Sequence, residues 1–220
     1  MSKTIETLFS KDDLKLIEEA VRNAETQTAG EIVPFAVQAS DSYEIALWRA
    51  GMLCGAIVLV CFVMFHSFSD SWQPFELVQV VLGTMSASLV GVALARYVDA
   101  AKRLFAGKDE INRAVGQRAA EAFLSEEVFN TKDRTGILLF LSLLEHKVVV
   151  LGDSGINAKV QQREWESIVK TIVDGMKAGT PAAGLVDAIR QCGNLLHREG
   201  VAIQKDDANE LSNRLRTSEQ

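Results

Sequence analysis

The middle of this 220-residue sequence carries almost no formal charge. Between Ala50 and Ala95 there is no lysine or arginine, and the only acids are Asp70 and Glu76. The rest of the chain holds nearly all of the 23 basic and 29 acidic residues, and the net charge is −6. This balance argues against a nucleic-acid-binding protein, because such proteins need an excess of cations to displace counterions from phosphates.

Cysteine and histidine are also scarce, with three residues of each. Cys54, Cys61 and Cys192 form no CxxC pair, and the histidines form no HExxH or HxH pattern. The sequence therefore contains no zinc-site motif. We expect the cysteines to be buried as small hydrophobic residues. The N-terminal stretch has no apolar signal core, so we predict no cleaved secretion signal.

Two long uncharged segments predict a pair of membrane-spanning helices. They are residues 50–68 and 77–95, each 19 residues long. About 20 helical residues cross a hydrocarbon core of about 30 Å. The second segment is rich in small residues, which let helices approach closely in lipid. Between the segments lies a short turn, with Trp72 and Pro74, that places an aromatic residue at the interface. The alternative is a pair of buried helices in a soluble core, but the length of both runs favours the membrane.

Basic residues flank these two segments but are missing from the turn between them. Arg49 precedes the first segment, and Arg96, Lys102, Arg103 and Lys108 follow the second. Positively charged flanks are retained on the cytoplasmic side of a membrane. We therefore predict a two-pass membrane protein with both termini in the cytoplasm.

The sequence before the first uncharged segment predicts one helix and one strand. Apolar residues at helical spacing predict a helix from about Lys11 to Thr26. Ser10 is its expected N-cap, with Asp13 as the capping-box partner. The apolar stretch 31–39 follows as a strand, in which Pro34 indicates an edge position or a bulge because proline has no backbone donor.

The sequence after the second segment predicts helices around a strand hairpin. Asp99–Phe129 is amphipathic, and two further helical stripes include Trp165 and Leu185. Between them, Gly136–Leu143 and Lys147–Leu151 are apolar strands joined by a polar turn. Their near-continuous apolar character predicts that helices cover both faces. We therefore expect an α/β fold with a small central sheet between two helical layers.

The predicted elements divide the chain into four segments. Residues 1–45 form the first part of the α/β domain, and residues 46–98 form the transmembrane hairpin. Residues 99–200 complete the domain, and residues 201–220 form a flexible tail. The first strand must rejoin the later two in one sheet, because an isolated strand cannot satisfy its backbone groups.

Several stretches of the chain resemble the TPM domain family, known from thylakoid-lumen proteins of photosystem II repair and from bacterial membrane proteins. They are Glu25–Val37, Arg134–Ile156, Glu164–Ile189 and, at the tail, Asp207–Asn213. The resemblance implies an α/β/α sandwich. The membrane hairpin that interrupts the domain resembles the bacterial membrane-embedded variants, which implies a place in the bacterial inner membrane. Some members are described as weak acid phosphatases, and some bind calcium.

Polar residues follow two of the predicted strands and form a candidate ligand site. Asp153, Ser154 and Gly155 come directly after the third strand, and Asp41 follows the first. Ligands tend to bind beyond the carboxyl ends of strands in open α/β sheets. If these strands run parallel, Asp153 and Asp41 could hold calcium or magnesium through carboxylate oxygens. The alternative is a plain polar turn, for which Asp, Ser and Gly are ordinary residues.

Two further groups of polar residues have two interpretations each. Glu25, Thr28 and Glu31 recur every three residues where the first helix meets the first strand. They either line a ligand pocket, or Thr28 and Glu31 satisfy backbone donors at the turn. Asp133 and Arg134 form either a local ion pair or a phosphate contact. An exposed ion pair of this kind contributes less than about 1 kcal/mol.

Two functions are compatible with these features. The first is a membrane-anchored domain that binds a membrane-protein partner and helps to assemble or maintain a membrane complex. The anchor raises the local concentration near such a partner, so even a weak interface suffices. The second is a weak metal-dependent phosphatase or hydrolase, in which a metal at Asp153 polarises a phosphoryl oxygen.

Overall fold

The computed structural model describes residues 5–68, 77–201 and 211–218. The chain forms two compact units. Met1–Ser40 and Arg113–Gln220 make up the first, here called the α/β unit, and Asp41–Asn112 make up the second, here called the hairpin unit. The predicted turn with Trp72 and Pro74 lies outside the described residues.

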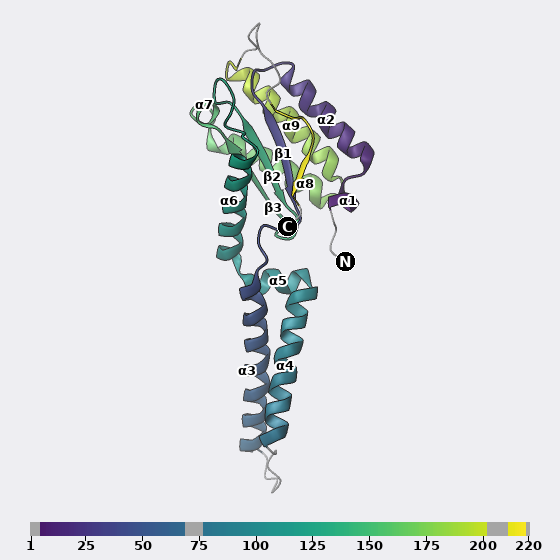
Figure 1. Ribbon diagram of the computed structural model, residues 1–220, viewed down its shortest axis with the longest axis vertical. Helices are drawn as coiled ribbons and strands as arrows, with labels where there is room; N and C mark the ends of the chain where they lie inside the picture. Colours follow the sequence, from purple (N-terminus) through teal and green to yellow (C-terminus); the bar gives the residue numbers. More distant parts are fainter. Residues whose placement is uncertain (1–4, 69–76, 202–210, 219–220) are drawn as a thin grey trace. The chain divides into compact units, whose positions relative to one another are not determined.

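The α/β unit is built on a four-stranded mixed sheet in the order β3-β2-β1-β4 (Figure 1). β1 pairs in parallel with β2 and β4, whereas β3 runs antiparallel to β2. The β2–β3 pair confirms the predicted strand hairpin, and β1 rejoins it as expected. The strand bounds are Ile32–Val37 for β1, Ile137–Ser142 for β2, Lys147–Gly152 for β3 and Arg216–Ser218 for β4.

β4 makes β1 an internal strand, which differs from the flexible tail predicted for residues 201–220. Pro34 pairs with Leu139 of β2, and the β4 ladder begins only at Phe35. Pro34 thus lies just outside the β4 ladder, where its missing N–H costs no bond to that strand. With three residues, Arg216–Ser218, β4 is too short to show a periodic pattern in the sequence.

Helices cover both faces of this sheet, which confirms the predicted fold class. One face packs against α2, α8 and α9. The part of α6 that belongs to this unit, residues 113–125, lies on the other side (Figure 1). Phe35 and Phe140 stack with ring centroids 5.9 Å apart. β2 is fully buried, whereas β3 is only half-buried. The apolar sequence of β3 therefore predicted more burial than the structure shows. The helices are α1 (Ile5–Leu8), α2 (Lys11–Glu25), α6 (Lys108–Ser125), α7 (Ser154–Asn157), α8 (Gln162–Lys177) and α9 (Pro181–Arg198).

The N-cap of α2 matches the one predicted from the sequence. Ser10 Oγ accepts a hydrogen bond from Asp13 N at 3.2 Å, and Asp13 Oδ2 accepts one from Ser10 N at 2.9 Å. This reciprocal pair is the predicted capping box of α2.

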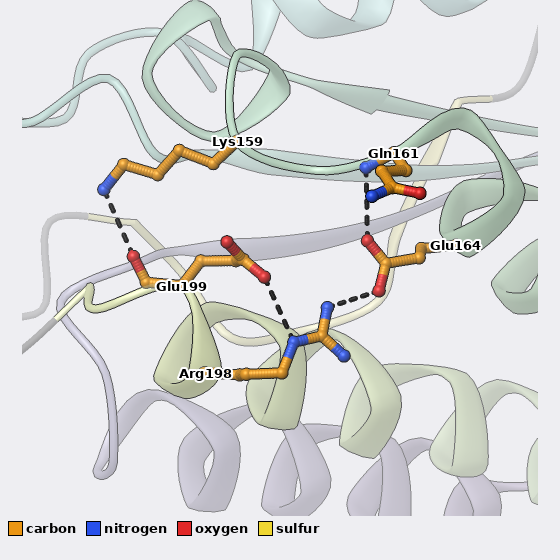
Figure 2. A network of polar contacts seen from close by, with 5 residues as sticks. All are labelled: Lys159, Gln161, Glu164, Arg198 and Glu199. Atoms are coloured by element: carbon orange, nitrogen blue, oxygen red, sulfur yellow. Dashed lines mark hydrogen bonds and ion pairs between the residues drawn. The ribbon is translucent and has the colours of Figure 1, made fainter.

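A polar network joins the start of α8 to the end of α9 (Figure 2). Arg198 donates to the carboxylates of Glu164 and Glu199, and Lys159 Nζ donates to Glu199 O at 3.3 Å. The hydrogen bond from Gln161 N and then the Arg198 guanidinium lower the pKa of Glu164. Because these side chains face solvent, the network fixes the two helix ends rather than forming a ligand pocket.

The amphipathic segment predicted at Asp99–Phe129 is two helices rather than one. α5 (Asp99–Ala106) ends at Gly107, and α6 begins at Lys108. Gly107 has a φ of 85°, a left-handed conformation that glycine adopts without a steric penalty. The amphipathic pattern continues through both helices, so it did not reveal that one helix ends and another begins at Gly107.

The hairpin unit consists mainly of α3 (Glu44–Phe68) and α4 (Leu77–Tyr97), which pack along each other (Figure 1). Both helices extend beyond the predicted ranges 50–68 and 77–95. The uncharged run marked only their apolar parts, whereas the helices continue through polar residues such as Glu44 and Arg49. Arg49 Nη1 donates to Ala106 O at 2.9 Å and so caps α5.

The outward-facing surface of the hairpin is apolar. Both helices are long and apolar enough to cross a membrane, with 11% and 6% of their most apolar windows buried within the protein. The residues whose side chains are more than half exposed include Met52, Val60, Phe65, Leu82, Met85 and Leu89.

The three cysteines differ in their surroundings. Cys192 is buried in α9, as predicted, and burial raises the pKa of its thiol to about 12. Cys54 is half-buried between the hairpin helices. Cys61 is exposed, so the prediction of burial was wrong for this residue because it faces away from the helix pair.

Small residues allow the two hairpin helices to approach closely, as the sequence predicted. A Cβ atom at Gly91 would lie 2.6 Å from Ala50 O and 2.9 Å from Cys54 Sγ. A Cβ atom at Gly55 would lie 2.3 Å from Ser88 Oγ. The contact therefore depends on the missing side chain of Gly91, which faces backbone, whereas the Ser88 hydroxyl opposite Gly55 can rotate away.

Gly91→Val is expected to destabilise the hairpin by about 1–3 kcal/mol, the usual cost of overpacking. The measurement is denaturant unfolding in detergent, followed by the helical circular dichroism signal. Gly116→Val is the control, because a Cβ atom there meets nothing within 4 Å. The two variants share the same loss of glycine from a helix. Equal losses in both would contradict the close packing at Gly91.

Candidate functional site

The turn after β3 is a polar corner of the α/β unit. Asp153 caps α7, and its Oδ1 accepts a hydrogen bond from Ser154 N at 2.6 Å. Its Oδ2 lies 2.8 Å from Arg134 Nε. The Asp153 side chain is 5% exposed, whereas that of Arg134 is 53% exposed. The carboxylate is thus buried against protein partners, and the cation beside it is open to solvent.

Gly155 packs this corner against the segment before β2. Its N–H donates to Arg134 O at 2.9 Å, and a Cβ atom on Gly155 would lie 2.2 Å from Asp133 O. Only glycine fits this approach. Arg134 also lies 5.7 Å from the centroid of the Phe129 ring. The observed partner of Arg134 is therefore Asp153 and not, as the first interpretation had it, its neighbour Asp133.

Asp41 and Asp153 do not follow parallel strands. β2 is parallel to β1 and antiparallel to β3. The last residue of β3 therefore lies at the same end of the sheet as the first residue of β1. The prediction of parallel strands, which a cation shared by Asp41 and Asp153 required, is therefore wrong. Asp41 belongs to the hairpin unit, where its Oδ1 accepts hydrogen bonds from Ser42 Oγ at 3.3 Å and Tyr43 N at 3.4 Å.

No cluster of three histidine, cysteine or acidic side chains that could hold a metal ion occurs among residues 5–68, 77–201 and 211–218. Calcium or magnesium binding at Asp153 stays a prediction from the sequence.

A pair of glutamates lies at the junction of α2 and β1. Glu25 Oε1 accepts a hydrogen bond from Ile32 N at 3.0 Å, and Asn213 Nδ2 donates to Glu25 Oε2. Glu31 is 6% exposed. Burial raises the pKa of Glu25 to about 8, and the neighbouring Glu31 carboxylate adds to this rise, whereas the Ile32 amide opposes it. Burial therefore favours the protonated form of Glu25.

The backbone role predicted for Thr28 is confirmed, and Glu25, for which it was not predicted, has the same role. Glu25 satisfies the first N–H of β1, and Thr28 Oγ1 accepts a hydrogen bond from Gly30 N at 3.2 Å. Both contacts close the turn between helix and strand. Asn213 completes the site from the end of the chain, and no local sequence signal could have joined it to Glu25.

A third polar cluster, missed from the sequence, lies at the other end of the sheet. Glu145 Oε1 accepts a hydrogen bond from Ser40 N at 2.8 Å, and Ser142 Oγ donates to Glu145 Oε2. The hydroxyls of Ser40 and Ser142 are 2.7 Å apart. All three residues are at most 8% exposed. The cluster therefore holds the end of β1 to the β2–β3 turn and presents no nucleophile to solvent.

Comparison with known proteins identifies the fold. The family model of the TPM domain matches residues 102–195, a range that contains the Asp153 corner. Residues 102–195 therefore match the TPM domain. This confirms the resemblance found in the sequence, and the match includes β2, β3 and α8 of the TPM domain.

One solved structure gives the same fold assignment. The NMR structure of the BA42 protein from the psychrophilic bacterium Bizionia argentinensis matches with a TM-score of 0.58 and 21% sequence identity. The match covers 98% of this chain and 99% of that chain. At this identity the likeness concerns the fold alone. A comparison with curated proteins finds no match.

Proposed function

We propose that α3 and α4 anchor the protein in a lipid bilayer, and that its TPM domain is a binding module for a membrane-protein partner. In this role the protein assists the assembly or maintenance of a membrane complex. The observation that carries the anchor is the exposure of the apolar hairpin surface. Only 11% and 6% of its two apolar windows are buried, whereas a core helix of a soluble protein is mostly buried.

The hairpin exposes enough apolar side chains for lipid to stabilise it substantially. Burying one large apolar side chain is worth about 1.5–3 kcal/mol. Val60, Phe65, Met85 and Leu89 are each more than half exposed, and they belong to a much larger set on the same two helices. A patch of this kind on a water-soluble monomer would promote association. In a bilayer, the lipid hydrocarbon covers this patch, so no protein partner is needed to remove it from water.

The basic residues support a bacterial inner-membrane location with both termini in the cytoplasm. Arg49 at one end of α3 and Arg96 at the matching end of α4 begin a basic flank that continues through Lys102 and Lys108. Such flanks stay on the cytoplasmic side. A phosphatase reporter fused to the C-terminus, which is active only outside the cytoplasm, should give no activity. Activity of this fusion in intact cells would overturn the orientation.

The edge of β3 supports the binding role of the TPM domain. β3 is the outermost strand, and among the described residues no strand pairs with its outer side. Asp153 N donates to Gly136 O at 2.9 Å. Every second residue of an antiparallel strand bonds to its partner, so this bond shows which residues of β3 bond to β2 and which face outward. By this alternation, the N–H groups of Val148 and Val150 point away from β2. A partner strand can add to the sheet at this edge.

A site-specific photo-crosslinker tests this binding role in intact membranes. At Lys147, the exposed first residue of β3, it should yield one defined crosslinked species. The matched control is Lys170, whose side chain is 77% exposed on α8 and which should yield none. Combining the Lys147 crosslinker with Val150→Pro should abolish the species, because proline removes the outward N–H. Val150→Ala controls for the lost side chain. Equal products from Lys147 and Lys170 would contradict the proposal.

A metal-dependent phosphatase is the second candidate, favoured by the solvent-exposed Arg134 beside the buried Asp153 carboxylate. Such a cation can contact a phosphate ester. The assay is hydrolysis of a generic phosphate ester by the purified protein with calcium, magnesium or a chelator. The binding role predicts no metal-dependent turnover. Turnover that is lost in Asp153→Asn, with an unchanged unfolding transition, would establish the enzyme instead.

A further inference from the structure

The hairpin unit contains a groove at the end of its helices where the basic flank begins. It has a volume of about 580 Å³, within the range of small-molecule sites. Its lining comes from α3, α4, α5 and the segment just before α3, all within this one unit. The lining residues are Ser42, Glu44, Leu47, Trp48, Val92, Arg96, Tyr97 and Lys102.

The polar side chains of this groove form no ion pair with one another. Within the described part of the chain, Arg96 and Lys102 have no carboxylate partner, and Glu44 has no cation partner. With two cations and one anion, the lining has a formal charge of +1. It therefore suits a ligand with one net negative charge and a further polar group.

The apolar part of the lining indicates what kind of anion fits. Trp48 and Tyr97 are 70% and 80% exposed, and amphipathic rings of this kind are enriched at the level of lipid headgroups. Leu47 and Val92 lie beside them. A free phosphate ion would leave this apolar surface unused, whereas an acyl chain would cover it.

We propose that this groove binds one anionic phospholipid, with its phosphate held by Arg96 and Lys102. Glu44 accepts a hydrogen bond from a headgroup hydroxyl, and the glycerol backbone lies against Trp48. Phosphatidylglycerol has this chemistry: one net negative charge, hydroxyl donors and two acyl chains. This inference rests on the proposed membrane anchor and adds a specific lipid site to it.

Quenching of Trp48 fluorescence tests the site directly. The full chain, with Trp72→Phe to reduce background, is reconstituted in phosphatidylcholine vesicles with a small fraction of brominated lipid. The signal of the matching Trp48→Phe variant is subtracted. At equal fractions, brominated phosphatidylglycerol should be enriched at Trp48 about fivefold over brominated phosphatidylcholine, the ratio expected for one unit of charge.

Charge variants separate a site from diffuse attraction. Arg96→Gln with Lys102→Gln should abolish the preference for phosphatidylglycerol. Lys108→Gln, an exposed cation of the same unit outside the groove, should retain it. Equal quenching by both brominated lipids, or an equal loss in all variants, would overturn the lipid site and leave the anchor standing. No quenching by either lipid would overturn both.

Discussion

Lysines at the centres of both hairpin helices are expected to release the protein from the membrane. Val60 and Met85 lie near the middle of the two uncharged runs, and their side chains are 56% and 59% exposed. A lysine at the centre of a membrane helix costs about 2.5–3.5 kcal/mol, so Val60→Lys with Met85→Lys costs about 5–7 kcal/mol. The measurement is the fraction of protein that stays in the membrane pellet after an alkaline carbonate wash.

The control introduces the same charges outside the hairpin. Leu16 in α2 and Leu124 in α6 are 54% and 63% exposed, so Leu16→Lys with Leu124→Lys matches the number, type and exposure of the changes. This control should stay in the pellet as the unchanged protein does. If the hairpin variant also stayed in the pellet, the exposed apolar surface would not be what holds the protein in the membrane.

Raising the pH from about 5 to 8 is expected to destabilise the α/β unit through Glu25. The folded state raises the pKa of this carboxyl from 4.5 to about 8, chiefly by burial. Below pH 4.5 both states hold the proton and the stabilising contribution is fully present. Between these values only the folded state holds the proton, so stability falls by up to about 1.4 kcal/mol per pH unit. Above pH 8 the contribution is lost.

Glu25→Gln tests this pH dependence because the amide cannot titrate. The variant should lose most of the slope in the free energy of urea unfolding between about pH 5 and pH 8. Glu166→Gln removes an exposed carboxylate from α8 and should keep the slope of the unchanged protein. An unchanged slope in Glu25→Gln would show that another group, Glu31 first among them, holds the proton.

The hairpin and the central sheet could be predicted from the sequence because both depend on local composition. The absence of lysine and arginine between Ala50 and Ala95 marks the apolar helices, and two apolar runs around Glu145 mark β2 and β3. Boundaries were less accurate. α3 continues through Glu44 and Arg49, since charges at the end of an apolar helix do not interrupt its hydrogen bonds.

The candidate site could be predicted only in part, since strand direction and long-range partners leave no local pattern. The polar turn at Asp153 was found, but its partner Arg134 and the antiparallel direction of β3 required the structure. Ser40 meets Ser142 across 102 positions, and Asn213 meets Glu25 across 188. A single serine or asparagine carries no signal of such a contact.

Labelling of Cys61 with a charged, membrane-impermeant maleimide tests the lipid-embedded hairpin most directly. Cys61 is exposed on α3 within the uncharged run, and Cys54→Ala with Cys192→Ala leaves it as the single thiol. In intact proteoliposomes we expect no labelling, because hydrocarbon keeps the reagent from the thiol, and full labelling after denaturation in dodecyl sulfate. Rapid labelling in intact proteoliposomes would place α3 in water and contradict the membrane anchor.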